Sequence, residues 1–129
     1  MTELDQTKSP KNILLIDDDI KFSIGMVALL KREGYEVTNS RNGKEGLEIL
    51  KTSIPDLILC DVMMPNPDGM EVKTILNGDN RFRNIPFIFI SAKTTTSDQE
   101  KAKALGVSEY ILKPFVVKDV LEKIERLIG

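Results

Sequence analysis

Short apolar runs alternate with longer amphipathic stretches along most of the chain. Three of these runs, ILLI, LILC and FIFI, are apolar at every position instead of every second one. Continuous apolar character is typical of strands that are covered on both faces. Five runs predict strands, at residues 12–17, 35–39, 56–61, 86–91 and 109–112. The amphipathic stretches predict five helices, near residues 19–33, 43–52, 69–77, 98–105 and 116–128.

Residues with known capping preferences support these helix limits. Ser97, with Glu100 three residues later, predicts a capping box for the fourth helix. Asn42 predicts an N-cap for the second helix, because its side chain accepts a hydrogen bond from the first turn. Gly34 and Gly106 stand where the first and fourth helices are expected to end.

The strict alternation of strands and helices predicts a parallel sheet, because each helical connection returns the chain to the same end of the sheet. For five strands in 129 residues, the flavodoxin-like order 2-1-3-4-5 fits better than a six-stranded Rossmann sheet. We therefore expect an α/β protein with a doubly wound sheet and three layers, α/β/α. The chain has no internal repeat or interdomain linker, which predicts one domain, at residues 11–129. The polar residues 1–10 are expected to form a leader before it.

Composition narrows the chemistry that this domain can perform. The hydrophobic share of 41% and five Phe residues are enough to fill one core. The chain contains no His, which excludes an imidazole base, a Ser-His-Asp triad, a His zinc ligand and a histidine phosphodonor within the chain. A single Cys excludes intramolecular disulfides and Cys-rich metal motifs.

Charge and hydropathy give no sign of nucleic-acid or membrane partners. The chain has 18 Lys and Arg against 20 Asp and Glu, a formal net charge of −2, so no basic footprint is present. The first ten residues, MTELDQTKSP, lack the apolar core of a signal peptide, and no apolar run is long enough to span a bilayer. With one thiol and no export signal, the cytoplasm is the expected compartment.

Polar side chains stand at the carboxyl ends of the predicted strands, where doubly wound sheets bind their ligands. Three consecutive Asp residues, 17–19, follow the first strand, and Asp61 ends the third. Ser91 ends the fourth strand and Lys113 follows the fifth. We therefore expect segments far apart in the sequence to bring carboxylates, a hydroxyl and an ammonium to one edge of the sheet.

An acidic cluster after the first strand, with no glycine-rich loop there, points to a divalent cation. Carboxylate oxygens bind hard cations, and Mg²⁺ commonly bridges such groups to phosphate. Lys113 is then able to pair with one phosphoryl oxygen, and Ser91 to donate a hydrogen bond to another. Asp61 remains as the oxygen nucleophile, because carboxylates form covalent phosphoryl intermediates.

Four segments in this order resemble the receiver domain of two-component response regulators, of the chemotaxis-type single-receiver kind. They are ILLIDDD, PDLILCDVMMPNPDG, FIFISAK and YILKPF. Each segment alone is a weak signal, but the ordered set at ordinary spacing, from about residue 12 to the C-terminus, is specific. The resemblance implies a phosphoacceptor signalling domain and not an enzyme, although such a domain assists its own phosphorylation and dephosphorylation.

The resemblance implies roles for the acidic residues. Asp61 would be the phosphoacceptor, taking a phosphoryl group from the histidine of a partner kinase or phosphotransfer protein. Asp18 would bind Mg²⁺ directly and Asp17 chiefly through water. Asp61 would complete the metal site together with the backbone carbonyl of Met63.

The resemblance also implies a switch. Ser91 would be the switch hydroxyl, Lys113 the lysine that pairs with the phosphoryl group, and Tyr110 the aromatic residue that turns inward on activation. The family often has a cis peptide at Lys113–Pro114. Two departures are mild: Asn-Pro follows MMP where the family often has Gly-Met, and Ser replaces the commoner Thr at position 91.

Signal output would be a population shift of the loop after the fourth strand, the fourth helix and Tyr110. A downstream effector or a second copy of the chain would read it on the face formed by the fourth helix, fifth strand and fifth helix. Met63 and Lys93 lie two residues beyond Asp61 and Ser91, and we expect them to tune the lifetime of the acyl phosphate. We expect either a stand-alone receiver or a segment of a longer protein.

The first helix carries two apolar stripes. One is expected to face the sheet and consists of Phe22, Met26, Leu29 and Leu30. The other has no evident core to fill and consists of Ile20, Ile24 and Val27. Either the sheet and a neighbouring helix cover this second stripe, or it is a docking patch for a histidine-bearing helical partner.

Some residues also have simpler or rival interpretations. Asp19 is expected to serve as an N-cap or first-turn residue and not as a metal ligand. Cys60 is expected to be a small hydrophobic residue in a buried strand without redox function. A Mg²⁺-dependent phosphatase would need a second acid where Met63 stands. A phosphorylation-independent pseudo-receiver conflicts with the intact set of acids, hydroxyl and lysine.

Overall fold

The computed structural model describes residues 9–92 and 95–129. Its strands are β1 (Asn12–Ile16), β2 (Glu36–Ser40), β3 (Leu57–Asp61), β4 (Phe87–Ser91) and β5 (Glu109–Leu112). Its helices are α2 (Ile20–Arg32), α3 (Gly43–Leu50), α4 (Gly69–Asn77), α5 (Thr96–Ala104) and α6 (Val117–Ile128). The strands form one parallel sheet in the order β2-β1-β3-β4-β5. The predicted doubly wound topology is therefore confirmed.

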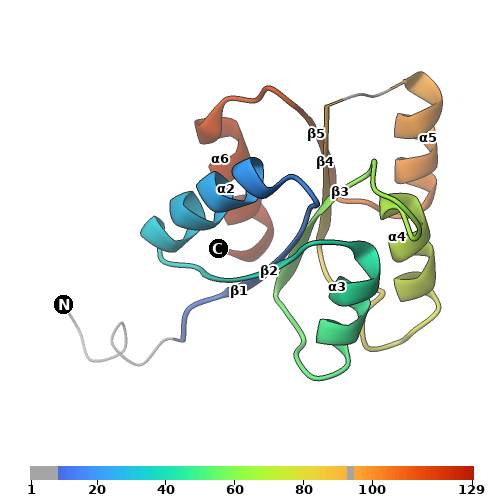
Figure 1. The fold of residues 1–129 in the computed structure, drawn as a ribbon, viewed down its shortest axis with the longest axis horizontal. Helices are drawn as coiled ribbons and strands as arrows, with labels where there is room; N and C mark the ends of the chain where they lie inside the picture. Colours follow the sequence, from blue (N-terminus) through green and yellow to red (C-terminus); the bar gives the residue numbers. More distant parts are fainter. Residues whose placement is uncertain (1–8, 93–94) are drawn as a thin grey trace.

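Helices cover both faces of the sheet, with α2 and α6 on one face and α3, α4 and α5 on the other (Figure 1). Side chains of the central strands alternate between the two layers, because successive residues of a strand point to opposite faces. In β4, Phe87 and Phe89 pack on the α3–α4–α5 side, while Ile88 and Ile90 pack on the α2–α6 side. Burial on both faces explains why the central strands are apolar without alternation.

The helix ends follow the predicted signals at three of four places. The Asn42 side chain accepts a hydrogen bond from the first turn of α3, and Gly34 and Gly106 adopt positive φ angles of 97° and 82° just beyond α2 and α5. The predicted capping box at Ser97 is wrong. Thr95 is the N-cap of α5, and Asp98 completes its capping box.

Most element limits differ from the prediction by one or two residues, and two of the differences have an evident physical reason. Helix α5 begins at Thr96, two residues before the predicted start, because the capping box forms two residues earlier. Strand β2 begins at Glu36 and not at Tyr35, whose backbone N–H donates to the Leu30 carbonyl at the end of α2. Within the described part of the chain, no helix is long and apolar enough to cross a membrane.

Candidate functional site

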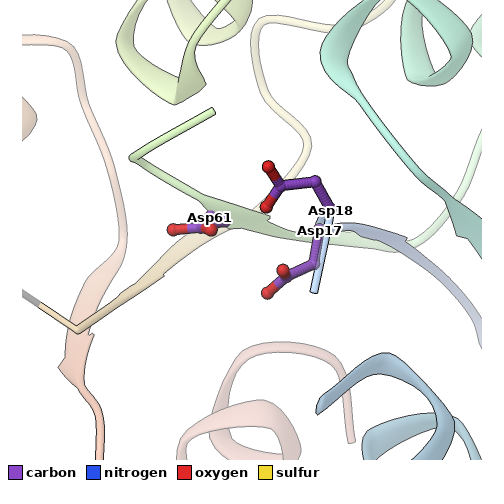
Figure 2. A group of neighbouring side chains, drawn as sticks. All are labelled: Asp17, Asp18 and Asp61. Carbon is purple, nitrogen blue, oxygen red and sulfur yellow. The ribbon is translucent and has the colours of Figure 1, made fainter. Parts of the chain in front are cut away.

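Three carboxylates converge at the carboxyl edge of the two central strands. Parallel pairing places Ile16 of β1 beside Cys60 of β3. Asp17 and Asp61, which follow them directly, therefore lie side by side at the edge of the sheet. Asp17, Asp18 and Asp61 each offer an oxygen that lies within 4.8 Å of an oxygen of the other two (Figure 2). Asp17 and Asp61 are buried, whereas Asp18 is exposed. This donor set suits a hard divalent cation.

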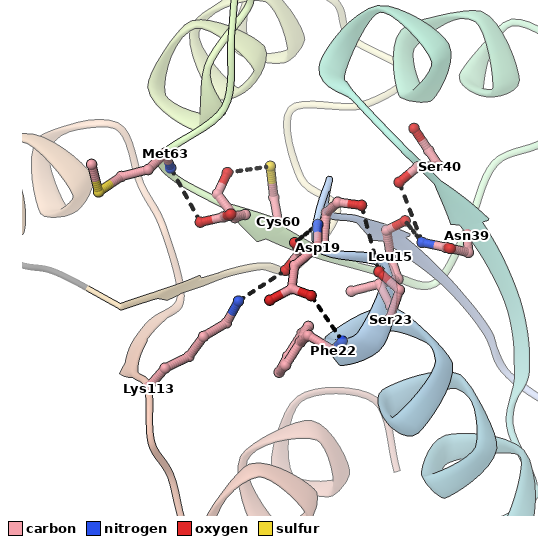
Figure 3. A network of polar contacts seen from close by, with 11 residues as sticks. Leu15, Asp19, Phe22, Ser23, Asn39, Ser40, Cys60, Met63 and Lys113 are labelled. Carbon is pink, nitrogen blue, oxygen red and sulfur yellow. Dashed lines mark hydrogen bonds and ion pairs between the residues drawn. The ribbon is translucent and has the colours of Figure 1, made fainter.

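Lys113 brings one ammonium to this cluster from the end of β5. Its Nζ lies 3.2 Å from Oδ2 of Asp17 (Figure 3) and 3.8 Å from the centre of the Phe22 ring. Its backbone N–H donates to the carbonyl of Ser91 at 2.7 Å, which ties the end of β5 to the end of β4. The peptide bond between Lys113 and Pro114 is cis, as the resemblance implied.

Burial and mutual repulsion make Asp61 and Asp17 weaker acids than usual. Burial, and next the charge of Asp17, raise the pKa of Asp61 to about 6, although the Met63 N–H and Lys113 oppose the shift. Burial also raises the pKa of Asp17, against the lowering effects of the Asp19 N–H and Lys113. The Met63 N–H donates to Oδ1 of Asp61 at 3.1 Å. One ammonium therefore compensates only part of the negative charge.

We expect Asp61→Asn to stabilise the protein in a chelator at neutral pH. The pKa of Asp61 is higher in the folded state, at about 6, than its ordinary value of 3.8. The folded state thus binds the proton more tightly, and stability is lost as pH rises through about 4 to 6. Neutralising the side chain should recover on the order of 1–3 kcal/mol above that window and little below it.

Thermal melting of wild type and Asp61→Asn at about pH 4 and about pH 7.5 measures this effect. Asp19→Asn is the matched control, because it removes a neighbouring charge outside the three-acid cluster and Asn also caps helices well. A gain for Asp61→Asn that is equal at both pH values would contradict the account of the cluster.

Three of the other predicted site residues lie on β4, on β5 and in the loop after β3. Ser91 is buried at the end of β4. Met63 lies in the loop after β3 with its side chain 56% exposed. Tyr110 is half-buried in β5, with its ring against that of Phe89 at 5.8 Å between centroids. Lys93 lies outside the described residues.

Two simpler interpretations agree with the structure. The side chain of Asp19 caps α2 by accepting from the Phe22 N–H at 3.1 Å (Figure 3). Cys60 is buried in β3, and its thiol donates to the carbonyl of Asp61 at 3.2 Å. Burial raises the pKa of the Cys60 thiol well above its ordinary value, so a reactive thiolate is disfavoured.

The second apolar stripe of α2 is only partly exposed. Ile20 and Ile24 are 62% and 67% exposed. Val27 is half-buried and packs against the buried cluster between α2, α6 and the sheet, as expected if neighbouring elements cover part of this stripe. The exposed part of the stripe is therefore confined to the first two turns of α2.

Two residues near the cluster had no functional interpretation from the sequence. Phe22 was expected only to face the sheet, but its ring also makes a cation–π contact with the Lys113 ammonium. Gly69 opens α4 where a Cβ would lie 2.5 Å from the carbonyl oxygen of Asp61 and 2.8 Å from Cα of Val62. The Asp-Gly pair after MMP signals a helix start, but the sequence does not reveal this close approach to the Asp61 backbone.

A doubly wound flavodoxin-like sheet with three carboxylates and a lysine at its carboxyl edge defines the class of receiver-type signalling domains. The family model of the response regulator receiver domain matches residues 13–125. The chain therefore belongs to the response regulator receiver domain family of two-component systems. Members of this family interact with histidine kinases or phosphotransfer proteins and with effectors, and typically bind Mg²⁺ through an acidic pocket.

Individual relatives show the same likeness over nearly the whole chain. Polar-differentiation response regulator DivK of Brucella anthropi is 33% identical over 120 residues, which are 93% of this chain and 98% of DivK. Chemotaxis protein CheY4 of Vibrio cholerae superposes with a TM-score of 0.87 at 25% identity, covering 92% of this chain and 99% of CheY4. A receiver domain of a histidine kinase from Syntrophus aciditrophicus superposes with a TM-score of 0.85 at 29% identity. The match covers 92% of this chain and 89% of that receiver domain.

Proposed function

We propose that the chain accepts a phosphoryl group on Asp61, in a Mg²⁺-dependent reaction, from the phosphohistidine of a partner kinase or phosphotransfer protein. The convergence of Asp17, Asp18 and Asp61 within 4.8 Å supports this function most strongly. A carboxylate oxygen of Asp61 would attack phosphorus as the phosphorus–nitrogen bond breaks and its electron pair returns to the imidazole. The donor histidine lies outside this sequence, which contains none.

Asp17, Asp18 and Asp61, with the backbone carbonyl of Met63, would hold the metal ion. Bound there, Mg²⁺ would neutralise charge on the phosphoryl oxygens and orient them. Its positive charge would also oppose the two effects that raise the pKa of Asp61, burial first and then the charge of Asp17, so that more of the nucleophile is ionised near neutral pH.

Lys113 and Ser91 would bind the new phosphoryl group. The Lys113 ammonium, now against Asp17, would pair with one phosphoryl oxygen, and the Ser91 hydroxyl would donate to another. Ser91 pairs with Leu112 across the β4–β5 ladder, and Tyr110 pairs with Phe89. A displacement of Ser91 would therefore also displace β5. Tyr110 on that strand would then turn inward and complete the switch.

Two surfaces would then contact partners. Ile20 and Ile24, with the edge of Val27, would dock the helix that carries the donor histidine, because exposed apolar stripes near a site mark partner surfaces. The α5–β5–α6 face would present the switched state to an effector or to a second copy.

We assign the receiver domain to residues 11–129 after a polar leader at 1–10, and place it in the cytoplasm, where its lone thiol stays reduced.

A phosphodonor assay tests this function directly. Acetyl phosphate with Mg²⁺ should load about one phosphoryl group per chain, whereas the same mixture with excess chelator should load almost none. Equal incorporation with and without the metal would contradict the proposal, and so would continuous release of phosphate from simple phosphate esters, which would indicate a phosphatase.

Asp18→Asn should stabilise the metal-free protein while slowing phosphorylation by about 100-fold. The substitution removes one of three converging charges, but it also removes a proposed metal ligand. Loss of even an outer-shell partner of a ligand typically costs about 10–100-fold in metal affinity or activity. Saturating Mg²⁺ should raise the melting temperature of wild type by mass action and leave the variant nearly unmoved. Asp19→Asn should behave as wild type in both measurements. A lower melting temperature for Asp18→Asn in chelator, with no Mg²⁺ response in wild type, would refute the cluster.

Met63 and Lys93 should set the lifetime of the acyl phosphate. Each lies two residues beyond a residue of the proposed site, where its side chain can flank the path of attacking water. Met63 cannot orient water by strong hydrogen bonds, whereas a lysine can orient water or shield the phosphoryl group. Met63→Ala and Lys93→Ala should each change the decay rate several-fold, with Mg²⁺ affinity nearly intact. Unchanged decay in both variants would remove these two residues from the account.

A further inference from the structure

Residues of α3, α4 and the adjoining loops line a groove of about 400 Å³. Helices α3 and α4 lie on the face of the sheet opposite α2 and α6 (Figure 1). The apolar lining of the groove comes from both helices, the loop before α4 and the loop after it: Leu47, Leu50, Pro67, Ile75, Leu76 and Phe82. Ile75 is 53% exposed there, although it is a large apolar side chain. Volume and lining fall in the range of small-molecule sites, which are mostly apolar with a few polar groups.

Five charged side chains line the same groove, and four of them neutralise one another. Lys51 pairs with Glu48 at 3.0 Å, and Arg81 pairs with Asp79 at 2.8 Å. Arg81 holds the pKa of Asp79 down at about 2, so both members of this second pair are charged at neutral pH. Lys44 is the fifth, and it forms no ion pair with another residue in the described part of the chain.

We propose that this α3–α4 groove binds a small amphipathic monoanion, with the flat apolar body on Leu47 and Ile75 and the anionic group on Lys44. One uncompensated cation above an apolar floor matches one negative charge on an apolar ligand. A bare phosphate or a dianion would leave the apolar floor uncovered or a charge unpaired.

The proposed ligand site is separate from the acidic cluster but shares a wall with its loop. Pro67 lines the groove and belongs to the segment between Asp61 and α4. This segment packs closely on the start of α3, since a Cβ at Gly43 would lie 2.6 Å from the Pro67 carbonyl oxygen and 2.8 Å from its Cγ. A molecule in the groove would therefore touch the loop that follows the proposed phosphoacceptor.

Two matched probes test the proposal: 8-anilino-1-naphthalenesulfonate and N-phenyl-1-naphthylamine, which has the same ring system without the sulfonate. In titrations of the ¹⁵N-labelled full chain, the sulfonate should cause saturable amide shifts centred on Leu47, Ile75 and Phe82. Lys44→Gln should weaken its binding by about fivefold or more and leave the neutral probe unchanged. Lys103→Gln, which removes an exposed charge on α5 outside the groove, should change neither.

Several results would overturn the proposal. Shifts centred on Phe22 and Phe115 would place the probe in the apolar depression between α2 and α6. Equal weakening of both probes by Lys44→Gln would mean that the side chain acts through packing and not through charge. Amide shifts in the groove that follow protein concentration and not probe concentration would identify a second copy of the chain as its occupant.

Discussion

Lys113→Ala should yield a protein that accepts phosphate 10- to 100-fold more slowly and does not switch when it is phosphorylated. The Lys113 ammonium is the cation that lies against the acidic cluster, 3.2 Å from Asp17. Asp61 and the other two acids remain in the variant, so the metal site and nucleophile persist. The phosphoryl group, however, loses the partner that would draw β5 and its neighbours into the switched arrangement.

Amide shifts of the phosphorylated protein measure switching separately from phosphate loading. Wild type should show large shifts near Ser91 and Tyr110, whereas loaded Lys113→Ala should not. Lys113→Arg should also fail, because a planar guanidinium is not equivalent to a compact ammonium over the Phe22 ring. Lys118→Ala, an exposed lysine of α6, is the matched control and should switch normally. Wild-type shifts in loaded Lys113→Ala would contradict this role.

The fold was predictable because the features that determine it are local sequence patterns. Runs such as LILC and FIFI, apolar at every position, require burial on both faces, and helices between the strands impose parallel pairing. Once the order of strands is known, the residue after each strand is placed at the same edge. That logic brought Asp17 and Asp61 together from 44 positions apart.

Features that depend on tertiary packing were not predictable from the sequence. Two overlapping sequence patterns, Thr95 with Asp98 and Ser97 with Glu100, are able to form a capping box at the start of α5. Only the folded path of the chain selects the first of them. Burial of Val27 depends on how α2 sits on its neighbours, and the contact of Lys113 with Phe22 joins segments that no local pattern relates. The strength of the pKa shift at Asp61 likewise follows from its depth and from Asp17.

Asp61→Ala should lose phosphorylation altogether, which is the largest effect that the account predicts. Asp61 ends β3 within the three-acid cluster, buried beside Asp17, with one oxygen already held by the Met63 N–H. Among the described residues, only Asp17, Asp18 and Asp61 form such a cluster. Asp17 and Asp18 cannot replace the nucleophile, because the proposal requires them as ligands of the metal.

Intact-mass spectrometry after incubation with acetyl phosphate and Mg²⁺ tests this central claim most directly. Asp119→Ala, which removes an exposed carboxylate from α6, is the matched control. The account predicts one phosphoryl adduct on wild type and on Asp119→Ala, and none on Asp61→Ala. An equal adduct on Asp61→Ala, or no adduct on wild type with Mg²⁺ present, would contradict it.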